Sequence, residues 1–452
     1  MGITGWDAGR GVILLGMIVV LFFSQRYFLR ILIALKKHEK QSGSKFALRA
    51  LCAALVVLLV ATFILLREGV IPRGAFVAPL LGLWFASAFF AYLAVKLVHA
   101  VEWAWHCLQE FRAHRGKRAE GARFIVPLRR ASFQAAQLEN PQRRYFFQRA
   151  ARVAGAVPFV GALYGFAAER LQYQVERVEI PIPNLPPELD GLRIAQLSDI
   201  HIGAYMPRRH VRRAVQMMNE LGADLSVVTG DFITTARDPL EECVTEVGNL
   251  RAPLGVWGCL GNHEIYANCE DETTEMLRRV GVRVLRQQNA EIRWNGGVLN
   301  LIGVDYQRSR GFHGARLTML DGAERLVRRD APNILLSHNP NAFERAPELG
   351  IELTLAGHTH GGQVSVEILD RSINPARFMT DWVAGLYQRG VAGAESPAAS
   401  ASGPNRQSSS LVTGHPSFAT SCLYVNRGLG TVGAPVRLGA PPEITLLTLR
   451  RA

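Results

Sequence analysis

The first part of the chain is dominated by long apolar runs. Three uncharged runs lie within the first hundred residues, at Gly11–Phe23, Ala50–Leu66 and Gly74–Val95. A fourth and shorter run, Val153–Ala168, contains a proline. A membrane-spanning helix needs about 20 mostly apolar residues, so these runs predict a membrane domain of three to four transmembrane helices within residues 1–170. The first run is short for a span unless its flanking arginines extend toward the lipid headgroups.

From residue 171 onward the apolar positions fall into short runs. Segments rich in β-branched residues, each four to eight residues long, predict buried strands. They are Leu192–Leu197, Leu225–Thr229, Val256–Leu260, Val298–Val304, Ile334–Ser337 and Leu353–Ala356. Arg208–Leu221 and Asp271–Val280 have helical spacing, and the Asn295-Gly296-Gly297 step predicts a hairpin. Alternating strands and helices predict an α/β fold for residues 171–452.

A stretch near the C-terminus departs from this pattern. Residues 392–416 are crowded with Ala, Ser, Gly and Pro, a composition that predicts a flexible segment within the second domain.

Charge divides the chain in the same place. The 452 residues carry a net charge of +13, but residues 1–170 alone hold 23 Lys+Arg against 8 Asp+Glu, whereas the remainder is nearly neutral. Seven of these basic residues lie between Arg26 and Arg49, and twelve between Lys96 and Arg152. Basic loops beside apolar spans favour the cytoplasmic side. Since the second domain has no basic excess, no nucleic-acid partner is expected.

This charge pattern also predicts a location for the second domain. If Val153–Ala168 crosses the bilayer, everything after it lies outside the cytoplasm, as in a multi-pass protein of the cell inner membrane with a periplasmic domain. The preceding Arg143-Arg144-Tyr-Phe-Phe resembles a twin-arginine export signal. Two alternatives remain open: the arginines are an ordinary basic flank, or the run lies on the membrane or packs on the following domain.

Five of the predicted strands are followed by residues that bind metals. In chain order these residues are Asp199 and His201, Asp231, Asn262 and His263, His338, and His358 and His360. Each one alone is compatible with an ordinary turn or a structural histidine. Open α/β sheets, however, build their sites at the carboxyl ends of strands. The joint pattern therefore predicts a metal site at one edge of a sheet.

The spacing within these groups has a physical meaning. In an extended segment, residues i and i+2 point the same way, so Asp199 and His201 are expected to bind one ion together. His358 and His360 are expected to serve two neighbouring ions, and the two carboxylate oxygens of Asp231 allow it to bridge them. Mixed imidazole and carboxylate ligands favour Mn, Fe or Zn over Ca or Mg.

The ordered set of motifs resembles the calcineurin-like metallophosphoesterases. The motifs are Asp199-x-His201, Gly230-Asp231, Gly261-Asn262-His263-Glu264, His338 and Gly357-His358-Thr359-His360. The resemblance covers about residues 190–452. His360-Gly361-Gly362-Gln363 and the late segments Tyr424–Gly430 and Pro441–Ile444 are similar to the membrane-associated bacterial branch of that family.

The resemblance implies both a fold and a site. The fold would be a two-sheet β-sandwich flanked by helices, preceded here by transmembrane helices. It would hold two divalent metal ions. The first ion would be bound by Asp199, His201, Asp231 and His360, and the second by Asp231, Asn262, His338 and His358. Among the catalytic residues Asp231, Asn262 and His263, the last would lie near the leaving oxygen as proton donor or as a transition-state contact, oriented by Glu264. A water or hydroxide between the ions would attack phosphorus.

The function expected from the sequence is therefore metal-dependent hydrolysis of phosphomonoester, phosphodiester or pyrophosphate bonds. The alternative is a non-catalytic membrane receptor or scaffold with a metal-binding domain, which the complete ligand set disfavours. Membrane anchoring suggests a lipid-linked phosphorylated substrate, although a soluble diester met near the membrane is an open alternative.

Overall fold

The structure is a computed structural model, and it describes most of the chain. The described residues are 19–28, 54, 57, 61, 77–119, 141–308, 318–368, 371–378, 380–390 and 420–452. The flexible segment predicted at 392–416, nearly all of the run 50–66 and much of the run 11–23 lie outside them. The chain forms two compact units, one of Met1–Ile71 with Val77–Leu163 and one of Pro72–Phe76 with Tyr164–Ala452.

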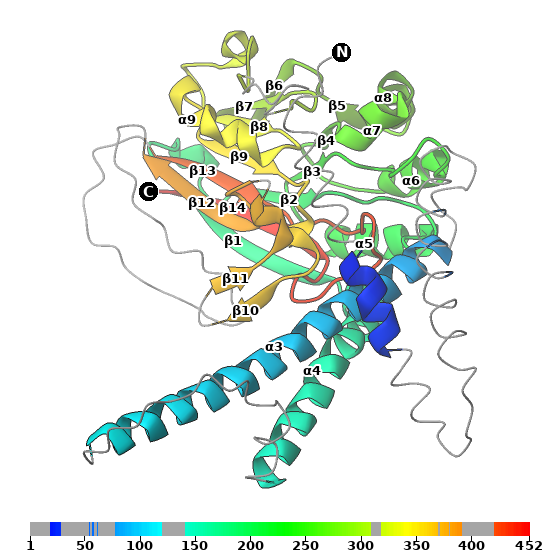
Figure 1. Cartoon of the computed structure of the whole chain (residues 1–452). Helices are drawn as coiled ribbons and strands as arrows, with labels where there is room; N and C mark the ends of the chain where they lie inside the picture. Colours follow the sequence, from blue (N-terminus) through cyan, green and yellow to red (C-terminus); the bar gives the residue numbers. More distant parts are fainter. Residues whose placement is uncertain are drawn as a thin grey trace, which may run out of the picture. The chain divides into compact units, whose positions relative to one another are not determined.

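The first unit is helical. It contains a helix over residues 19–28, α3 (Val77–Ala119) and most of α4 (Pro141–Ala167) (Figure 1). Gly82–Gln109 and Gln142–Leu171 are long and apolar enough to cross a membrane. The two helices pack closely, because a Cβ on Gly155 would lie 3.1 Å from Cγ2 of Val95. Two candidate membrane spans therefore precede the strands of the second unit, and the later span ends within that unit.

Two six-stranded mixed sheets form the centre of the second unit (Figure 1). The first has the order β1 (Gln174–Ile182), β14 (Glu443–Arg451), β2 (Arg193–Leu197), β3 (Leu225–Thr229), β4 (Val256–Cys259) and β5 (Val282–Val284). The second has the order β12 (Gly385–Gly390), β13 (Thr420–Val425), β9 (Leu353–Ala356), β8 (Asn333–Leu336), β7 (Gly297–Gly303) and β6 (Gln288–Trp294). A small ribbon pairs β10 (Val366–Ile368) with β11 (Arg371–Ile373).

The helices of the second unit are short and lie outside the sheets. They are α5 (Arg208–Glu220), α6 (Leu240–Val247), α7 (Asn262–Ala267), α8 (Glu270–Arg279) and α9 (Ala346–Leu349). Single 3₁₀ turns connect the elements at η2 (Glu169–Leu171), η3 (Pro187–Leu189), η4 (Ala323–Leu326), η5 (Pro340–Glu344), η6 (His360–Gly362) and η7 (Pro375–Phe378).

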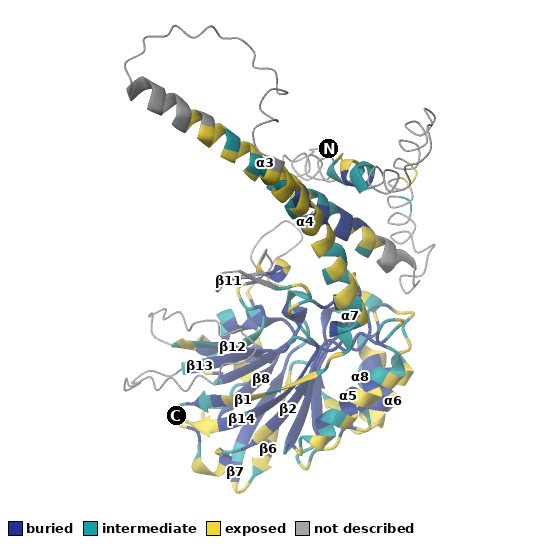
Figure 2. Cartoon of the chain, turned by 90° about the horizontal axis from the view of Figure 1, so that it is seen from below, coloured by how far each residue is buried: buried dark blue, intermediate teal, exposed yellow. Residues whose placement is uncertain are grey.

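Apolar side chains fill three layers between these elements. The middle layer joins the facing sheets and includes Ile194, Val227, Leu301, Leu336 and Leu355. A second layer packs the outer face of the first sheet against α5, α6 and α8, and a third covers the outer face of the second sheet. Figure 2 shows the central strands buried and the helices exposed on their outward faces. This confirms an α/β domain built from two packed sheets and flanked by helices.

All six predicted strands and both predicted helices are present, with ends within a residue or two of those expected. The hairpin is confirmed as well: β6 and β7 pair through Trp294 and Gly297, and Asn295 and Gly296 between them have φ of 51° and 91°. Such left-handed pairs match the twist of the flanking strands. Apart from β6, which the hairpin implies, the sequence did not predict the remaining strands β1, β5 and β10–β14.

The topology brings the carboxyl ends of both sheets to one edge. Neighbouring strands β2, β3 and β4 are parallel, as are β7, β8, β9 and β13. The two sheets are joined there because the buried amide of Gln196 donates from Nε2 to the carbonyl oxygen of Ala356 at 3.0 Å. The loops after β2, β3, β4, β8 and β9 therefore meet.

Candidate metal centre

The loops at this edge carry every metal-binding residue that the sequence singled out. Asp199 and His201 follow β2, Asp231 follows β3, Asn262 and His263 begin α7 after β4, His338 follows β8, and His358 and His360 follow β9. All eight are buried except His263 and His358, which are half-buried. Six of them fall into two groups of three, which a third group of His201, Asp231 and His263 links.

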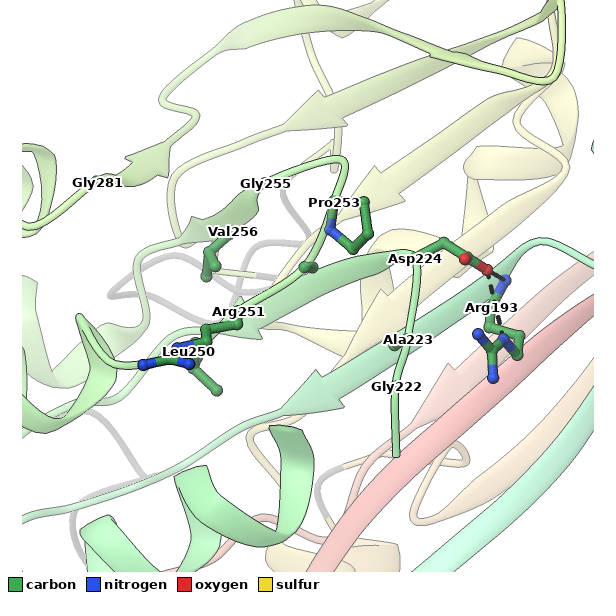
Figure 3. Close-up of a pocket in the computed structure, with 11 residues that line it drawn as sticks. Arg193, Gly222, Ala223, Asp224, Leu250, Arg251, Pro253, Gly255, Val256 and Gly281 are labelled. Carbon is green, nitrogen blue, oxygen red and sulfur yellow. Dashed lines mark hydrogen bonds and ion pairs between the residues drawn. The ribbon is translucent and has the colours of Figure 1, made fainter. Parts of the chain in front are cut away.

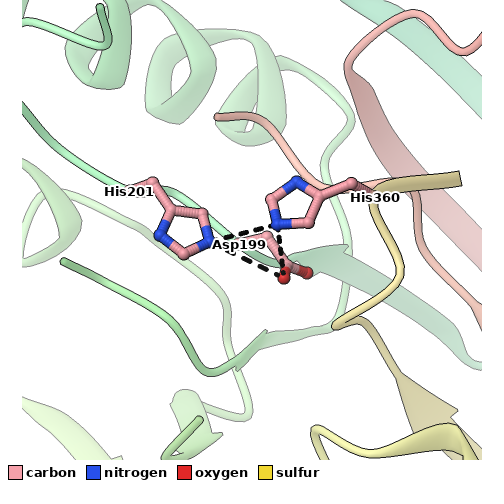
Figure 4. A group of neighbouring side chains, drawn as sticks. All are labelled: Asp199, His201 and His360. Carbon is pink, nitrogen blue, oxygen red and sulfur yellow. Dashed lines mark hydrogen bonds and ion pairs between the residues drawn. The ribbon is translucent and has the colours of Figure 1, made fainter. Parts of the chain in front are cut away.

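The first group contains Asp199, His201 and His360 (Figure 4). Nε2 of His201 lies 3.2 Å from Nε2 of His360, and the imidazole planes are stacked at 25°. Oδ1 of Asp199 lies 3.4 Å from Nε2 of His360 and 3.9 Å from Nε2 of His201. Three potential ligand atoms therefore converge on one point.

The second group contains Asp231, His338 and His358. Nε2 of His338 lies 3.0 Å from Oδ2 of Asp231 and 3.3 Å from Nδ1 of His358. The same Oδ2 is 3.5 Å from Nε2 of His201 in the first group. Asp231 thus faces both groups with one oxygen, whereas we expected it to use two. Its other oxygen, Oδ1, accepts a hydrogen bond from the backbone N–H of His263 at 2.9 Å.

The backbone at these positions is strained. Five of the candidate ligands have positive φ: Asp199 (49°), His201 (48°), Asp231 (57°), His358 (73°) and His360 (54°). Residues other than glycine rarely adopt this region, and each instance costs about 1–3 kcal/mol. The extended conformation expected for Asp199-x-His201 is therefore wrong. The chain turns sharply at each residue, and the turns rather than strand alternation aim the side chains.

Asn262 supplies a test of whether a cation fits. Its side chain is 4% exposed, and within the described part of the chain its Oδ1 is buried without a hydrogen-bond donor. Leaving such an oxygen unpaired costs about 1–3 kcal/mol. A cation beside the second group would compensate that cost, because carboxamide oxygens bind divalent ions well. The donor set and the unpaired oxygen both fit a metal ion.

Hydrogen bonds fix which imidazole nitrogens face inward. Nδ1 of His338 donates to the carbonyl oxygen of Thr229 at 2.6 Å, and Nδ1 of His201 donates to that of Ile233 at 3.0 Å. Their Nε2 atoms are then left to bind a metal, which is the arrangement common in metal sites. Burial lowers the pKa of both His201 and His358 to about 3, so both rings are neutral ligands at ordinary pH.

His338 behaves differently in the metal-free site. Burial disfavours its charged form, but the carboxylates of Asp231 and Asp199 outweigh this effect and raise its pKa to about 10. A proton on Nε2 then relieves the repulsion between the nitrogen lone pair and Oδ2 of Asp231. Burial likewise raises the pKa of Asp199 to about 6. The site therefore concentrates negative charge that a cation, or a proton in its place, neutralises.

Glu264 has a role other than the expected one. We expected it to orient His263, but its carboxylate accepts backbone N–H bonds from Gly261 at 2.8 Å, Asp231 at 3.1 Å and Phe232 at 2.8 Å. It therefore ties the loop after β3 to the loop after β4. His263 is oriented instead by Thr234, whose carbonyl oxygen accepts from Nδ1 at 2.8 Å.

Arg427 and Arg389 both have partners within the protein. Nε of Arg427 lies 2.8 Å from Oε2 of Glu443, and its Nη2 lies 2.6 Å from Oε1 of Glu176. Arg389 donates to the carbonyl oxygen of Glu344 at 3.1 Å. Arg437, which the sequence does not distinguish from other arginines, is fully buried and bonds to the carbonyl oxygen of His360.

A hollow at the other end of the strands offers no comparable chemistry. It has a volume of about 650 Å³ and lies where β2, β3 and β4 begin (Figure 3). The carboxylate of Asp224 there accepts from the backbone N–H of Arg193 at 2.9 Å and lies 3.5 Å from its Nε. Of the residues described, those lining it contain no His, Cys or Glu and a single Asp.

The order and geometry of these groups define a class of domain. Residues 192–362 match the family described as calcineurin-like phosphoesterase. The chain therefore contains a calcineurin-like metallophosphoesterase domain, which confirms the resemblance inferred from the motifs.

Similar proteins carry related names. A "Transmembrane protein with metallophosphoesterase domain" from Bos taurus is 32% identical over 62% of this chain and 57% of its own length. The protein of the same name from Danio rerio is 30% identical over 64% and 60%. The "UDP-2,3-diacylglucosamine pyrophosphatase LpxG" of Chlamydia trachomatis serovar D is 24% identical over 61% and 88%. The chain thus spans less than two thirds of the length of the first two relatives.

Proposed function

We propose that the second unit is a metal-dependent hydrolase of phosphate ester or pyrophosphate bonds that works with two divalent cations, with Mn, Fe or Zn favoured. The observation that carries this proposal is the position of Asp231, whose Oδ2 lies 3.0 Å from Nε2 of His338 in the second ligand group and 3.5 Å from Nε2 of His201 in the first. The first ion would be held by Asp199, His201, Asp231 and His360. The second would be held by Asp231, Asn262, His338 and His358.

The two cations, when bound, would activate a water molecule and neutralise charge on the phosphoryl oxygens. The protein residues would supply the remaining requirements. Asp231 would keep the two ligand groups in a fixed relation, since the backbone around it is held by Glu264. Asn262 would contribute a ligand without adding negative charge that repels the substrate. His263 would face the leaving oxygen with Nε2, because its Nδ1 is engaged by Thr234, and as an imidazolium it would donate the Nε2 proton there.

We also propose that the substrate is lipid-linked. The support is twofold: two candidate membrane spans precede the domain, and a relative is named for a pyrophosphatase of a diacylated nucleotide sugar. The chain would be a multi-pass protein of the inner membrane, and positive charge in its first 170 residues favours a catalytic domain outside the cytoplasm. Fusing a fluorescent protein that matures only in the cytoplasm to the C-terminus tests this orientation; bright cells would contradict it.

The reaction class is tested on the full-length protein in detergent. Metal is removed with a chelator, Mn, Fe(II), Zn, Ni or Mg is added back singly, and hydrolysis of mono- and bis-p-nitrophenyl phosphate is followed. Asp231→Asn should abolish turnover, because the ligands act as a unit. Asp330→Asn is the matched control, since Asp330 is exposed and pairs with Arg328. Turnover by folded Asp231→Asn protein would refute the shared-ligand assignment. A wild-type protein inactive with every metal would favour the receptor alternative.

The lipid proposal needs a separate comparison. A UDP-linked diacyl sugar in mixed micelles and the same nucleotide sugar without acyl chains are offered to the metal-loaded protein. A higher kcat/KM for the acylated compound supports a lipid-linked substrate. Equal values would leave the reaction class intact and rule out recognition of the lipid.

A further inference from the structure

Arg437 is the largest fully buried side chain of the described part of the chain. A guanidinium out of water must find hydrogen-bond acceptors for its charge to be tolerated. It finds them in backbone carbonyl oxygens. Nη1 donates to the carbonyl oxygens of Arg427 at 2.7 Å, His360 at 3.1 Å and Ala440 at 3.1 Å. Nη2 donates to the carbonyl oxygens of Gly428 at 3.1 Å and Gly430 at 2.5 Å. One side chain thus joins the turn at His360 to the loop 427–430.

The loop that Arg437 holds forms a wall of the first ligand group. The backbone N–H of Leu429 donates to the backbone carbonyl oxygen of Ser198 at 3.0 Å. The backbone N–H of Gly430 donates to the backbone carbonyl oxygen of Asp199 at 2.8 Å. The approach is so close that a Cβ on Gly428 would lie 2.5 Å from Cβ of Asp199. Displacing this loop would move Asp199 directly.

Arg437 also supports the strained turn at His360. The backbone there has φ of 54° at His360 and 59° at Gly361. The hydrogen bond from Nη1 to the carbonyl oxygen of His360 fixes the turn from outside the ligand group. Strained turns persist when their surroundings determine them, and Arg437 is part of those surroundings.

The other side of the Arg437 segment contacts the end of α4. The backbone N–H of Arg437 donates to the carbonyl oxygen of Gly165 at 3.2 Å, and Glu169 accepts from the backbone N–H of Gly439 at 2.8 Å through Oε1. A Cβ on Gly165 would lie 2.5 Å from the carbonyl oxygen of Arg437 and 2.7 Å from Cγ1 of Val436. Only glycine permits this contact without moving the segment.

We propose that Gly165, Glu169 and Arg437 act together as positioning residues for the first metal ion, so that the last turn of a candidate membrane span is a structural part of the metal centre. The chain of contacts runs from Gly165 to the backbone of Arg437, and from its guanidinium to His360 and the loop beside Asp199. None of the three residues is among the proposed ligands. This role rests on the proposed two-metal site, in which these three residues would hold the ligands of the first ion in place.

The test adds a single methyl group at Gly165. Gly165→Ala in the full-length protein pushes on Arg437 from outside the site and should weaken binding of one Mn²⁺ about 10–100-fold, as loss of an outer support does in other metal sites. Binding of the other ion should change little. Electron paramagnetic resonance of the Mn²⁺-loaded protein then shows the spectrum of an isolated ion in place of a coupled pair. The matched control is Gly390→Ala, because a Cβ at Gly390 would meet nothing within 4 Å.

Substitutions at Arg437 complete the test. Arg437→Met removes every donor and should lose the same ion, whereas Arg437→Lys keeps the charge with fewer donors and should retain part of the affinity. If Gly165→Ala fails to fold, Arg437→Lys provides the measurement. Two ions bound with wild-type affinity in folded Gly165→Ala or Arg437→Lys protein would overturn the inference and leave the proposed function standing. Wild-type protein that binds fewer than two ions would instead overturn the proposed function.

Discussion

Raising the pH should tighten metal binding, and the structure identifies the proton responsible. In the metal-free site, burial opposes protonation of His338, but the charges of Asp231 at 3.0 Å and Asp199 at 3.9 Å prevail and raise its pKa to about 10. A metal ligand must give up its proton. His201 and His358, whose pKa values burial lowers to about 3, have none to give at neutral pH. Loading both ions should therefore release one proton.

The magnitude follows from that pKa. Between about pH 7.5 and about pH 9, the unprotonated fraction of a group with a pKa of about 10 rises about 30-fold, so the product of the two metal association constants should rise by the same factor, or about 2 kcal/mol. Metal binding should tighten as the pH rises, because the metal-free protein holds the proton on His338 and the metal-loaded protein does not. Below about pH 6 the dependence should steepen, since burial raises the pKa of Asp199 to about 6.

Isothermal titration calorimetry with Mn²⁺ measures this release. Titrations at one pH in two buffers of different ionisation enthalpy give the number of protons released, and titrations across the pH range give the slope. One proton released near pH 8 is the expected value. Binding that is independent of pH in this range, with no proton released, would refute the electrostatic account of His338.

Three further predictions concern single residues. His263→Gln should lower kcat about 10²–10⁴-fold while both ions stay bound, which separates proton donation from metal binding in steady-state kinetics and metal analysis; loss of an ion would make His263 a ligand. Gly428→Ala should weaken the ion beside Asp199 about 10–100-fold in Mn²⁺ titrations, whereas Gly222→Ala, which has a similar φ but no neighbour within 4 Å, should not; equal effects would point to backbone strain alone. Asn262→Ala should abolish binding of the second ion in the same titrations, and two tightly bound ions would show that its unpaired oxygen has another purpose.

The position of the site was predictable because it depends on local patterns and one topological rule. Short apolar runs predicted the strands, and Asp231 and His338 each lie two residues after the end of one of them. Parallel strands bring residues at their carboxyl ends to one edge of the sheet, independently of the order of the strands. Knowing which strands are adjacent was not needed to place the ligand residues together.

The shape of the site was not predictable, because residues distant in the sequence determine it. Asp199 and His201 were expected to extend along a strand, but the loop at Gly428–Gly430, more than two hundred positions later, packs on them in a turned conformation. Arg437 resembles a surface arginine in the sequence, and its burial depends on a cage of carbonyl oxygens formed by three separate segments. Strands β1 and β14 pair although more than two hundred and fifty positions separate them, which periodicity within one window does not reveal.

The most direct test of the account is to count ions and turnover on the same sample. Metal-stripped full-length protein is titrated with Mn²⁺ while bound metal per chain and hydrolysis of bis-p-nitrophenyl phosphate are measured together. The account predicts that two ions bind per chain and that activity rises with occupancy of the second. A folded protein that binds no metal, or one whose hydrolysis is unaffected by complete metal removal, would contradict it.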